Sequence, residues 1–287
     1  MPLKTIKKDT ADTLTLEWVL HVQNYRLTLD KKRCVGCQIC SLACPKEAIK
    51  TQKPPTTQAE KAQKAKIDVD LAKCNFCGIC DVLCPYGAVK ITVNGKHLLS
   101  VLEKESFPQL IRDVGVDVAK FPSDLRKGEE VCPLGLIRVS DGKADVDLEH
   151  CPCCRVCEFK LPDGAMKVRK FLDGKILIHE GKCPEGCKAC LDVCPITGAL
   201  YLSDDGRKVR VNETFCVYCG ACRLVCPVEE ALELKRTHVS HTSVRSGAWN
   251  KALEKLTSPL EMTKELKTKG SLRATEAVRN RLGLKES

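Results

Sequence analysis

Aromatic residues are scarce in this sequence: they make up 4% of its 287 residues, and only two of them are Trp. So few large apolar side chains argue against a single large hydrophobic core, and the length suggests about two domains. No apolar run approaches the roughly 20 residues that a membrane-spanning helix needs. The basic segment 1–8 is not followed by the apolar stretch of a secretory signal. The sequence therefore predicts a cytoplasmic protein without a membrane span.

Positive charge is unevenly distributed along the chain. The net charge of +10 would by itself suggest a nucleic-acid partner. Residues 1–33 carry seven Lys or Arg against four Asp or Glu, and residues 235–287 carry twelve against five. Residues 34–234 carry 28 of each sign and contain all the cysteines. Because no RNA- or DNA-binding motif accompanies the basic ends, we expect no nucleic-acid partner and a tail that packs within a complex.

Cysteine is the residue in excess, with 21 in the chain. In a cytoplasmic protein, clustered cysteines bind metal more often than they form disulfides. Residues 74–85 show the pattern most clearly, as C-x2-C-x2-C-x3-C-P. This is the ligand spacing of [4Fe–4S] clusters, whereas structural zinc sites normally split four ligands into two separated pairs. The spacing favours iron–sulfur clusters and leaves zinc as the weaker alternative.

A short segment of alternating apolar residues precedes each cysteine run and predicts a strand. These segments lie before Cys34, Cys74, Cys151, Cys183 and Cys216. A proline and a second apolar segment follow each run, so each unit is predicted to be strand, cluster loop, short helix and strand. A sixth lead, 114–117, precedes residues 121–133, which align without a gap to 183–195 but keep a single cysteine, Cys132.

The paired runs resemble bacterial two-cluster ferredoxin domains over residues 27–234. In that family, the first three cysteines of one run share a cluster with the fourth cysteine of the other run. The resemblance therefore implies five [4Fe–4S] clusters, held by ligand sets 1 to 5. Set 1 is Cys34, Cys37, Cys40 and Cys84; set 2 is Cys74, Cys77, Cys80 and Cys44; set 3 is Cys151, Cys154, Cys157 and Cys132; set 4 is Cys183, Cys187, Cys190 and Cys226; set 5 is Cys216, Cys219, Cys222 and Cys194.

The middle pair of runs is incomplete in an ordered way. Its second run has Leu161 in place of a fourth cysteine, which read alone would suggest an open iron and catalysis. Under the pairing rule Cys132 supplies that ligand and set 3 is complete. The opposite set has lost every ligand, and its positions hold Phe121, Leu125, Gly128 and Leu161. We infer that one whole cluster has been deleted and its site filled by apolar side chains, while Cys153 is left without a ligand role.

These repeats predict an α+β fold of three tandem bacterial-type two-cluster ferredoxin domains, with an N-terminal extension and a C-terminal helical tail. The expected parts are 1–24 (extension), 25–95 (ferredoxin domain I), 96–170 (linker and degenerate domain II), 171–236 (domain III) and 237–287 (basic helical tail). In the tail, residues 258–261 have the pattern of a capping box with Pro at the first helical position, which predicts a helix start.

Residues 102–113 and 132–137 resemble the polyferredoxin subunit of archaeal formylmethanofuran dehydrogenase. The resemblance implies a non-catalytic subunit that relays low-potential electrons to a tungsten or molybdenum enzyme reducing CO2 in methanogenesis. Its electron source would be ferredoxin or a heterodisulfide reductase complex. This chain departs from the family in having three ferredoxin pairs where four are usual. The alternative is a polyferredoxin or adapter subunit of a hydrogenase or heterodisulfide reductase complex, with clusters that mainly hold the fold.

Overall fold

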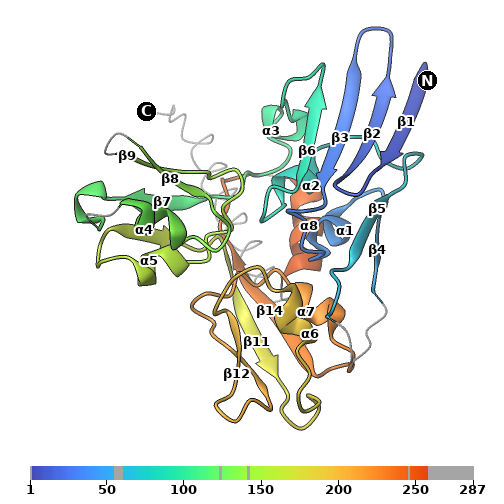
Figure 1. Ribbon diagram of the computed structural model, residues 1–287. Coiled ribbons are helices and arrows are strands. Elements are labelled where there is room, and N and C mark those ends of the chain that lie inside the picture. Colours follow the sequence, from blue (N-terminus) through green and yellow to red (C-terminus); the bar gives the residue numbers. More distant parts are fainter. Residues whose placement is uncertain (1, 55–60, 123–124, 141–142, 245, 258–287) are drawn as a thin grey trace, which may run out of the picture.

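The computed structural model describes residues 2–54, 61–122, 125–140, 143–244 and 246–257. Six similar units of strand, loop, short helix and strand follow one another within these ranges. They come in three pairs, which Figure 1 shows as three lobes: one in blue and cyan, one in green and one in yellow and orange.

The first lobe contains two units and an additional N-terminal hairpin. Its elements are β1 (Lys4–Asp9), β2 (Thr13–Val19), β3 (Asn24–Asp30), α1 (Ile39–Ala43), β4 (Ile49–Gln52), β5 (Lys66–Val69), α2 (Ile79–Val82) and β6 (Val89–Val93). The outer strands β3 and β6 pair antiparallel, and so do the inner strands β4 and β5. The hairpin extends the outer pair into a four-stranded sheet of order β1-β2-β3-β6. Leu14 and Leu16 of β2 point into the core with at most 1% exposure.

The middle and third lobes repeat the same nested pairing of strands. The middle lobe contains β7 (Asp113–Val116), η1 (Val118–Lys120), α4 (Leu125–Glu130), β8 (Ile137–Ser140), β9 (Lys143–Val146), α5 (Val156–Lys160) and β10 (Met166–Arg169). The third contains β11 (Leu172–Ile178), α6 (Ala189–Val193), β12 (Leu200–Leu202), β13 (Val209–Val211), α7 (Ala221–Val225) and β14 (Leu232–Val239). Outer strand pairs with outer strand (β7 with β10, β11 with β14), and inner with inner (β8 with β9, β12 with β13), all antiparallel.

The segment expected to be a linker after the first lobe is partly structured. It contains α3 (Ser100–Glu103), and Phe107 behind that helix is buried at 2% exposure. The Ile111 N–H donates to Ser240 O, and the Thr242 N–H donates to Gln109 O. The linker therefore runs beside the chain that leaves β14.

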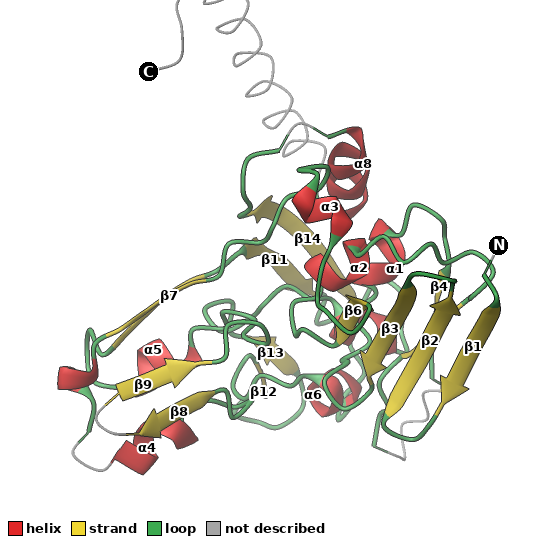
Figure 2. Cartoon of the chain, turned by 90° about the horizontal axis from the view of Figure 1, so that it is seen from above, coloured by secondary structure: helices red, strands yellow, loops and turns green. Residues whose placement is uncertain are grey.

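The first part of the tail packs on this chain. Helix α8 (Gly247–Leu256) begins at Ser246, whose Oγ accepts hydrogen bonds from the N–H groups of Ala248 and Trp249. Trp249 is fully buried and meets the Phe107 ring edge-on at 5.3 Å between centroids. Figures 1 and 2 both show α8 beside α1, where it closes the core of the first lobe. The predicted capping box at 258–261 lies outside the described residues.

The helices of the six units have only four to six residues. Isolated helices of this length are not stable in water, so they depend on packing and on whatever the adjacent cysteines bind. None of the helices in the described part of the chain is long and apolar enough to cross a membrane.

Candidate iron–sulfur centres

Ligand set 3 lies around one cavity in the middle lobe. Cys151 and Cys154 come from the loop before α5, Cys157 lies in the first turn of α5, and Cys132 comes from the loop after α4. The remaining wall is mainly apolar, and the cavity has an empty volume of about 380 Å³. The structure thus brings the isolated Cys132 to the run that lacks a fourth cysteine.

Ligand sets 4 and 5 each surround a cavity of similar size in the third lobe. The cysteines of set 4 line an empty volume of about 350 Å³ and those of set 5 about 380 Å³. In both cavities, as in the middle lobe, three cysteines come from one unit and one comes from its partner. Three cavities of nearly equal volume, each lined by its own four thiols, are expected if each binds a copy of the same group.

Cysteines from the two runs of the first lobe lie near one another. Burial raises the pKa of Cys40 well above its usual range, and Cys80, Cys84 and Cys34 raise it further. Burial likewise raises the pKa of Cys74 to about 11; the Phe76 N–H opposes this rise, and Cys77 and Cys44 add to it. Since these charge effects require proximity, Cys84 of the second run lies near Cys40 of the first, and Cys44 of the first run lies near Cys74 of the second.

The fourth cysteine of a run has a recurrent backbone contact. The Sγ atoms of Cys44, Cys84 and Cys132 each accept a hydrogen bond from the N–H four residues later, at 3.4, 3.2 and 3.3 Å. The loop around Cys132 therefore has the same local geometry as the loops of the two complete runs, although its own run has lost the other three cysteines.

Left-handed backbone precedes several of the short helices. Gly78 and Gly220 cap α2 and α7 at φ of 92° and 93°, a conformation that costs glycine little. A Cβ on Gly220 would lie 2.9 Å from Leu234 Cδ2. Glycine at this position therefore permits both the turn beside Cys219 and the close approach of β14.

The opposite site of the middle lobe is filled with hydrocarbon. Phe121 and Leu161 are 9% and 7% exposed and belong to one buried apolar cluster with Ile137 and Met166. The Phe121 ring lies so close to Gly128 that a Cβ there would be 2.8 Å from the ring. Phe121 and Leu161, which stand in place of two of the missing cysteines, thus belong to one apolar cluster, and the Phe121 ring covers Gly128.

Two arginines, the half-buried Arg112 and the buried Arg236, donate to the backbone of cysteine loops. Arg112 donates from Nη2 to Cys84 O at 2.8 Å and from Nη1 to Cys151 O at 3.1 Å. Arg236 is 8% exposed and donates to the carbonyl oxygens of Tyr218, Cys219 and Leu256. Neither arginine forms an ion pair with a carboxylate among the described residues.

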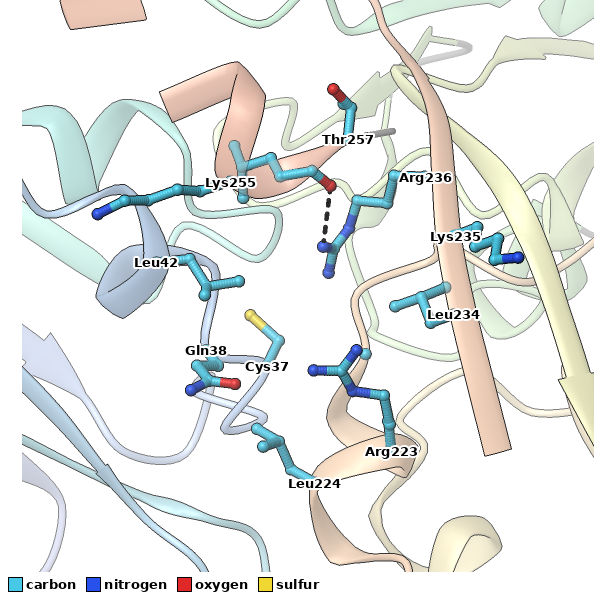
Figure 3. Close-up of a pocket in the computed structure, with 12 residues that line it drawn as sticks. Cys37, Gln38, Leu42, Arg223, Leu224, Leu234, Lys235, Arg236, Lys255 and Thr257 are labelled. Carbon is cyan, nitrogen blue, oxygen red and sulfur yellow. Dashed lines mark hydrogen bonds between the residues drawn. The ribbon is translucent and has the colours of Figure 1, made fainter. Parts of the chain in front are cut away.

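Arg236 also faces the first lobe across a pocket. Figure 3 shows its guanidinium and that of Arg223 directed into the pocket toward Cys37, while the ammonium groups of Lys235 and Lys255 point away. Burial lowers the pKa of Arg236, and negative charge on Cys37 and Cys219 opposes that change. An arginine remains charged in proteins, so a cation sits between set 1 and set 5.

The donor chemistry fits [4Fe–4S] clusters. Each site offers four thiols from two loops, and in sets 3 to 5 the walls of the cavity are largely apolar. In the described part of the chain, no three Cys, His, Asp or Glu side chains converge closely enough to hold one metal ion. A cubane distributes its four ligands over four irons, so its thiolates need not converge on one point.

Comparison with known proteins agrees with this chemistry. Residues 33–88 and 175–227 each match the family model of a 4Fe-4S dicluster domain. The chain is 26% identical over 124 residues to an iron–sulfur protein of Rhodospirillum rubrum, an alignment covering 35% of this chain and 63% of that protein. It is 32% identical over 90 residues to the polyferredoxin-like subunit of aliphatic sulfonate oxidoreductase of Pyrococcus furiosus, covering 28% of this chain and 50% of that subunit. The alignments thus span only part of these relatives.

A solved structure resembles almost the whole chain. It is a chain of the formate dehydrogenase–heterodisulfide reductase–formylmethanofuran dehydrogenase complex of Methanospirillum hungatei. The TM-score is 0.78 at 30% sequence identity, and the match covers 90% of this chain and 92% of that chain.

These findings define the class of the protein. It is an iron–sulfur protein with 4Fe-4S dicluster ferredoxin domains in its first and third lobes. Within that class it is a homologue of polyferredoxin-like redox subunits. The prediction of dicluster domains is therefore confirmed for these two lobes.

Residues outside the cysteine runs were missed by sequence reasoning. Arg112 and Arg236 contact the cysteine loops, and Tyr86 lines the cavity of set 5. No spacing rule identifies them, because each lies outside the cysteine run that it contacts. The only available signal was the position of Tyr86, two residues after Cys84.

Proposed function

We propose that this chain is a polyferredoxin that binds five [4Fe–4S] clusters through ligand sets 1 to 5. All three lobes are then dicluster-type ferredoxin domains, and the middle one has kept one cluster. Each proposed cluster has four cysteine ligands and no open iron. The chain therefore transfers electrons and does not catalyse a reaction of its own.

The observation that carries this proposal is the proximity of cysteines from successive sets. Set 2 meets set 1 through Cys80 and Cys40. After burial, Cys219 of set 5 is the largest influence that raises the pKa of Cys37 in set 1. Set 5 meets set 4 within the third lobe, where Cys190 acts on Cys222. Sets 2, 1, 5 and 4 thus form a continuous series.

The middle lobe joins this series at its side. Arg112 binds the backbone of Cys84, in set 1, and the backbone of Cys151, in set 3. We propose that cluster 3 exchanges electrons with cluster 1 at this contact. The chain then has three ends, at clusters 2, 3 and 4, where other redox subunits could dock.

The similar solved chain suggests which enzyme complex contains this chain. That chain belongs to a complex of formate dehydrogenase, heterodisulfide reductase and formylmethanofuran dehydrogenase. We propose that the present chain relays low-potential electrons to formylmethanofuran dehydrogenase for CO2 reduction in a methanogenic archaeon. The second candidate is a hydrogenase or heterodisulfide reductase complex, and heterodisulfide reductase is a component of the complex that contains the similar solved chain.

The test is anaerobic purification of the full chain with its native partners. We expect about 20 irons per chain from five filled cubanes and co-purification of formylmethanofuran dehydrogenase subunits. Reduction of the clusters at the turnover rate of the complex would support electron transfer. Clusters that stay oxidised during turnover would instead make the chain an adapter, and capture of a hydrogenase alone would identify the second host.

A further inference from the structure

The hydroxyl group of Tyr86 is buried without a partner. Tyr86 is 4% exposed, and its oxygen makes no hydrogen bond of normal geometry with any described residue. A buried hydroxyl without a hydrogen bond is unfavourable. Such a group in a well-packed region points to an acceptor that it meets fully only when the adjacent site is occupied.

The position of Tyr86 indicates which partner it meets. The residue follows Cys84 in the first lobe, yet its side chain lines the cavity of set 5 in the third lobe. Its ring packs in an apolar cluster with Val193, Ile196 and Val217 of that lobe. It therefore crosses from the loop that holds cluster 1 to the site of cluster 5.

The cysteine beside this hydroxyl is Cys219. Tyr86 and Cys219 line the same cavity and belong to the same apolar cluster. A tyrosine hydroxyl is a hydrogen-bond donor at neutral pH. When Cys219 binds iron, its thiolate sulfur is a hydrogen-bond acceptor beside the unpaired Tyr86 hydroxyl.

We propose that the Tyr86 hydroxyl donates a hydrogen bond to the Cys219 sulfur of bound cluster 5 and raises its reduction potential. The inference rests on the proposed function, since it requires a cluster at set 5. Hydrogen bonds to the sulfurs are among the factors that set the potential of such clusters. The partial positive charge of the hydroxyl proton favours the reduced cluster, which carries one more negative charge.

The first lobe would thereby tune a cluster in the third lobe. Cluster 5 would be a favourable electron acceptor only while the two lobes are docked. Separation of the lobes would remove the donor and lower the potential of cluster 5, so transfer from cluster 1 would become less favourable.

Replacement of Tyr86 by Phe tests the inference in the intact holoprotein. The substitution removes one oxygen and keeps the ring that packs between the lobes. The matched control is Tyr201→Phe, on β12 of the third lobe, where the side chain is 48% exposed. EPR-monitored redox titration would follow cluster 5, whose signal is identified as the one altered in Cys216→Ser.

We expect Y86F to keep the full iron content and to lower the potential of cluster 5 alone. A tenfold change in the equilibrium constant for reduction corresponds to about 59 mV for one electron. The wild type should also show a hyperfine coupling to a proton that exchanges in D2O, and Y86F should lack it. Y201F should match the wild type in both measurements.

An unchanged potential and proton coupling in Y86F, with all clusters present, would overturn the inference and leave the proposed function intact. Loss of the coupling without any shift in potential would likewise refute a tuning role. Absence of a cluster at set 5 in the wild type would instead refute the proposed function itself. The two failures are therefore distinguishable.

Discussion

Substitution of Cys132 tests the pairing of the cysteine runs. Its run has lost the other three cysteines, so Cys132 has no local reason to bind metal unless it serves the run at 151–157. Its Sγ lines the same cavity as Cys151, Cys154 and Cys157. We expect Cys132→Ala to remove one of the five proposed clusters and leave the other four.

The expected size of the effect follows from the cluster composition. Loss of one cubane lowers the iron content from about 20 to about 16 per chain. The thiolate charge that the cluster would have stabilised is also lost. Burial already raises the pKa of Cys154 to about 11 and, together with the neighbouring cysteines, that of Cys157 to about 12, so these groups would return to neutral thiols without a cluster.

The chain offers a matched control two residues from a proposed ligand. Cys153 is completely buried in the same loop, where its Sγ lies 4.0 Å from Cys151 O. Cys153→Ala should retain all the iron and the full EPR spectrum. Iron analysis and EPR of both variants, purified without oxygen, show whether either variant has lost a cluster.

Two results would refute the pairing. Cys132→Ala with unchanged iron would mean that set 3 has only three cysteines, and the catalytic interpretation of an open iron would return. Loss of four irons in Cys153→Ala would mean that this residue, and not Cys154 or Cys132, completes the set.

Three further substitutions test other parts of the structure. Phe121→Ala should destabilise the middle lobe by about 3 kcal/mol, because it removes a buried ring from a site that no cluster fills; denaturant unfolding should register this loss with no loss of iron. Arg112→Met should slow electron exchange of cluster 3 at least tenfold, as judged by freeze-quench EPR against the exposed control Arg169→Met; an unaltered rate would contradict the proposed junction. Arg236→Met should lower the reduction potentials of clusters 1 and 5 by about 59 mV, a tenfold change in each equilibrium constant. Arg236→Lys keeps the positive charge and should leave both potentials close to those of the wild type. Equal shifts in both variants would exclude an effect of charge.

The repeat structure could be predicted because local sequence determines it. Apolar alternation before and after each cysteine run identified the strands that form the nested pairs, such as β3 with β6 and β4 with β5. The gapless alignment of 121–133 with 183–195 also located the middle lobe, where α4 and Phe121 occupy the expected places. Burial of Phe121 against Gly128 agrees with the expected apolar filling of the site.

Other features could not be predicted because they depend on contacts between distant segments. Residues 1–24 were expected only as an extension, yet β1 and β2 complete the first sheet. The apolar alternation at Leu14 and Leu16 was a usable signal for β2. The start of α8 at Ser246 was missed because Ser258 offered a stronger capping pattern, and its packing depends on Phe107 from the linker.

The contacts between lobes give the clearest physical reason for the order of the clusters. Within a ferredoxin pair, shared cysteine runs bring two clusters together whatever the rest of the chain does. Between pairs, the contacts are made by Tyr86, which lines the cavity of set 5, by Arg112, which binds Cys84 and Cys151, and by Arg236, which binds Cys219 O and faces Cys37 across a pocket. A polar or charged group at such a contact holds two lobes together and also influences the reduction potential of the proposed clusters beside it. These contacts are therefore where substitution can change the direction of electron flow while every ligand is retained.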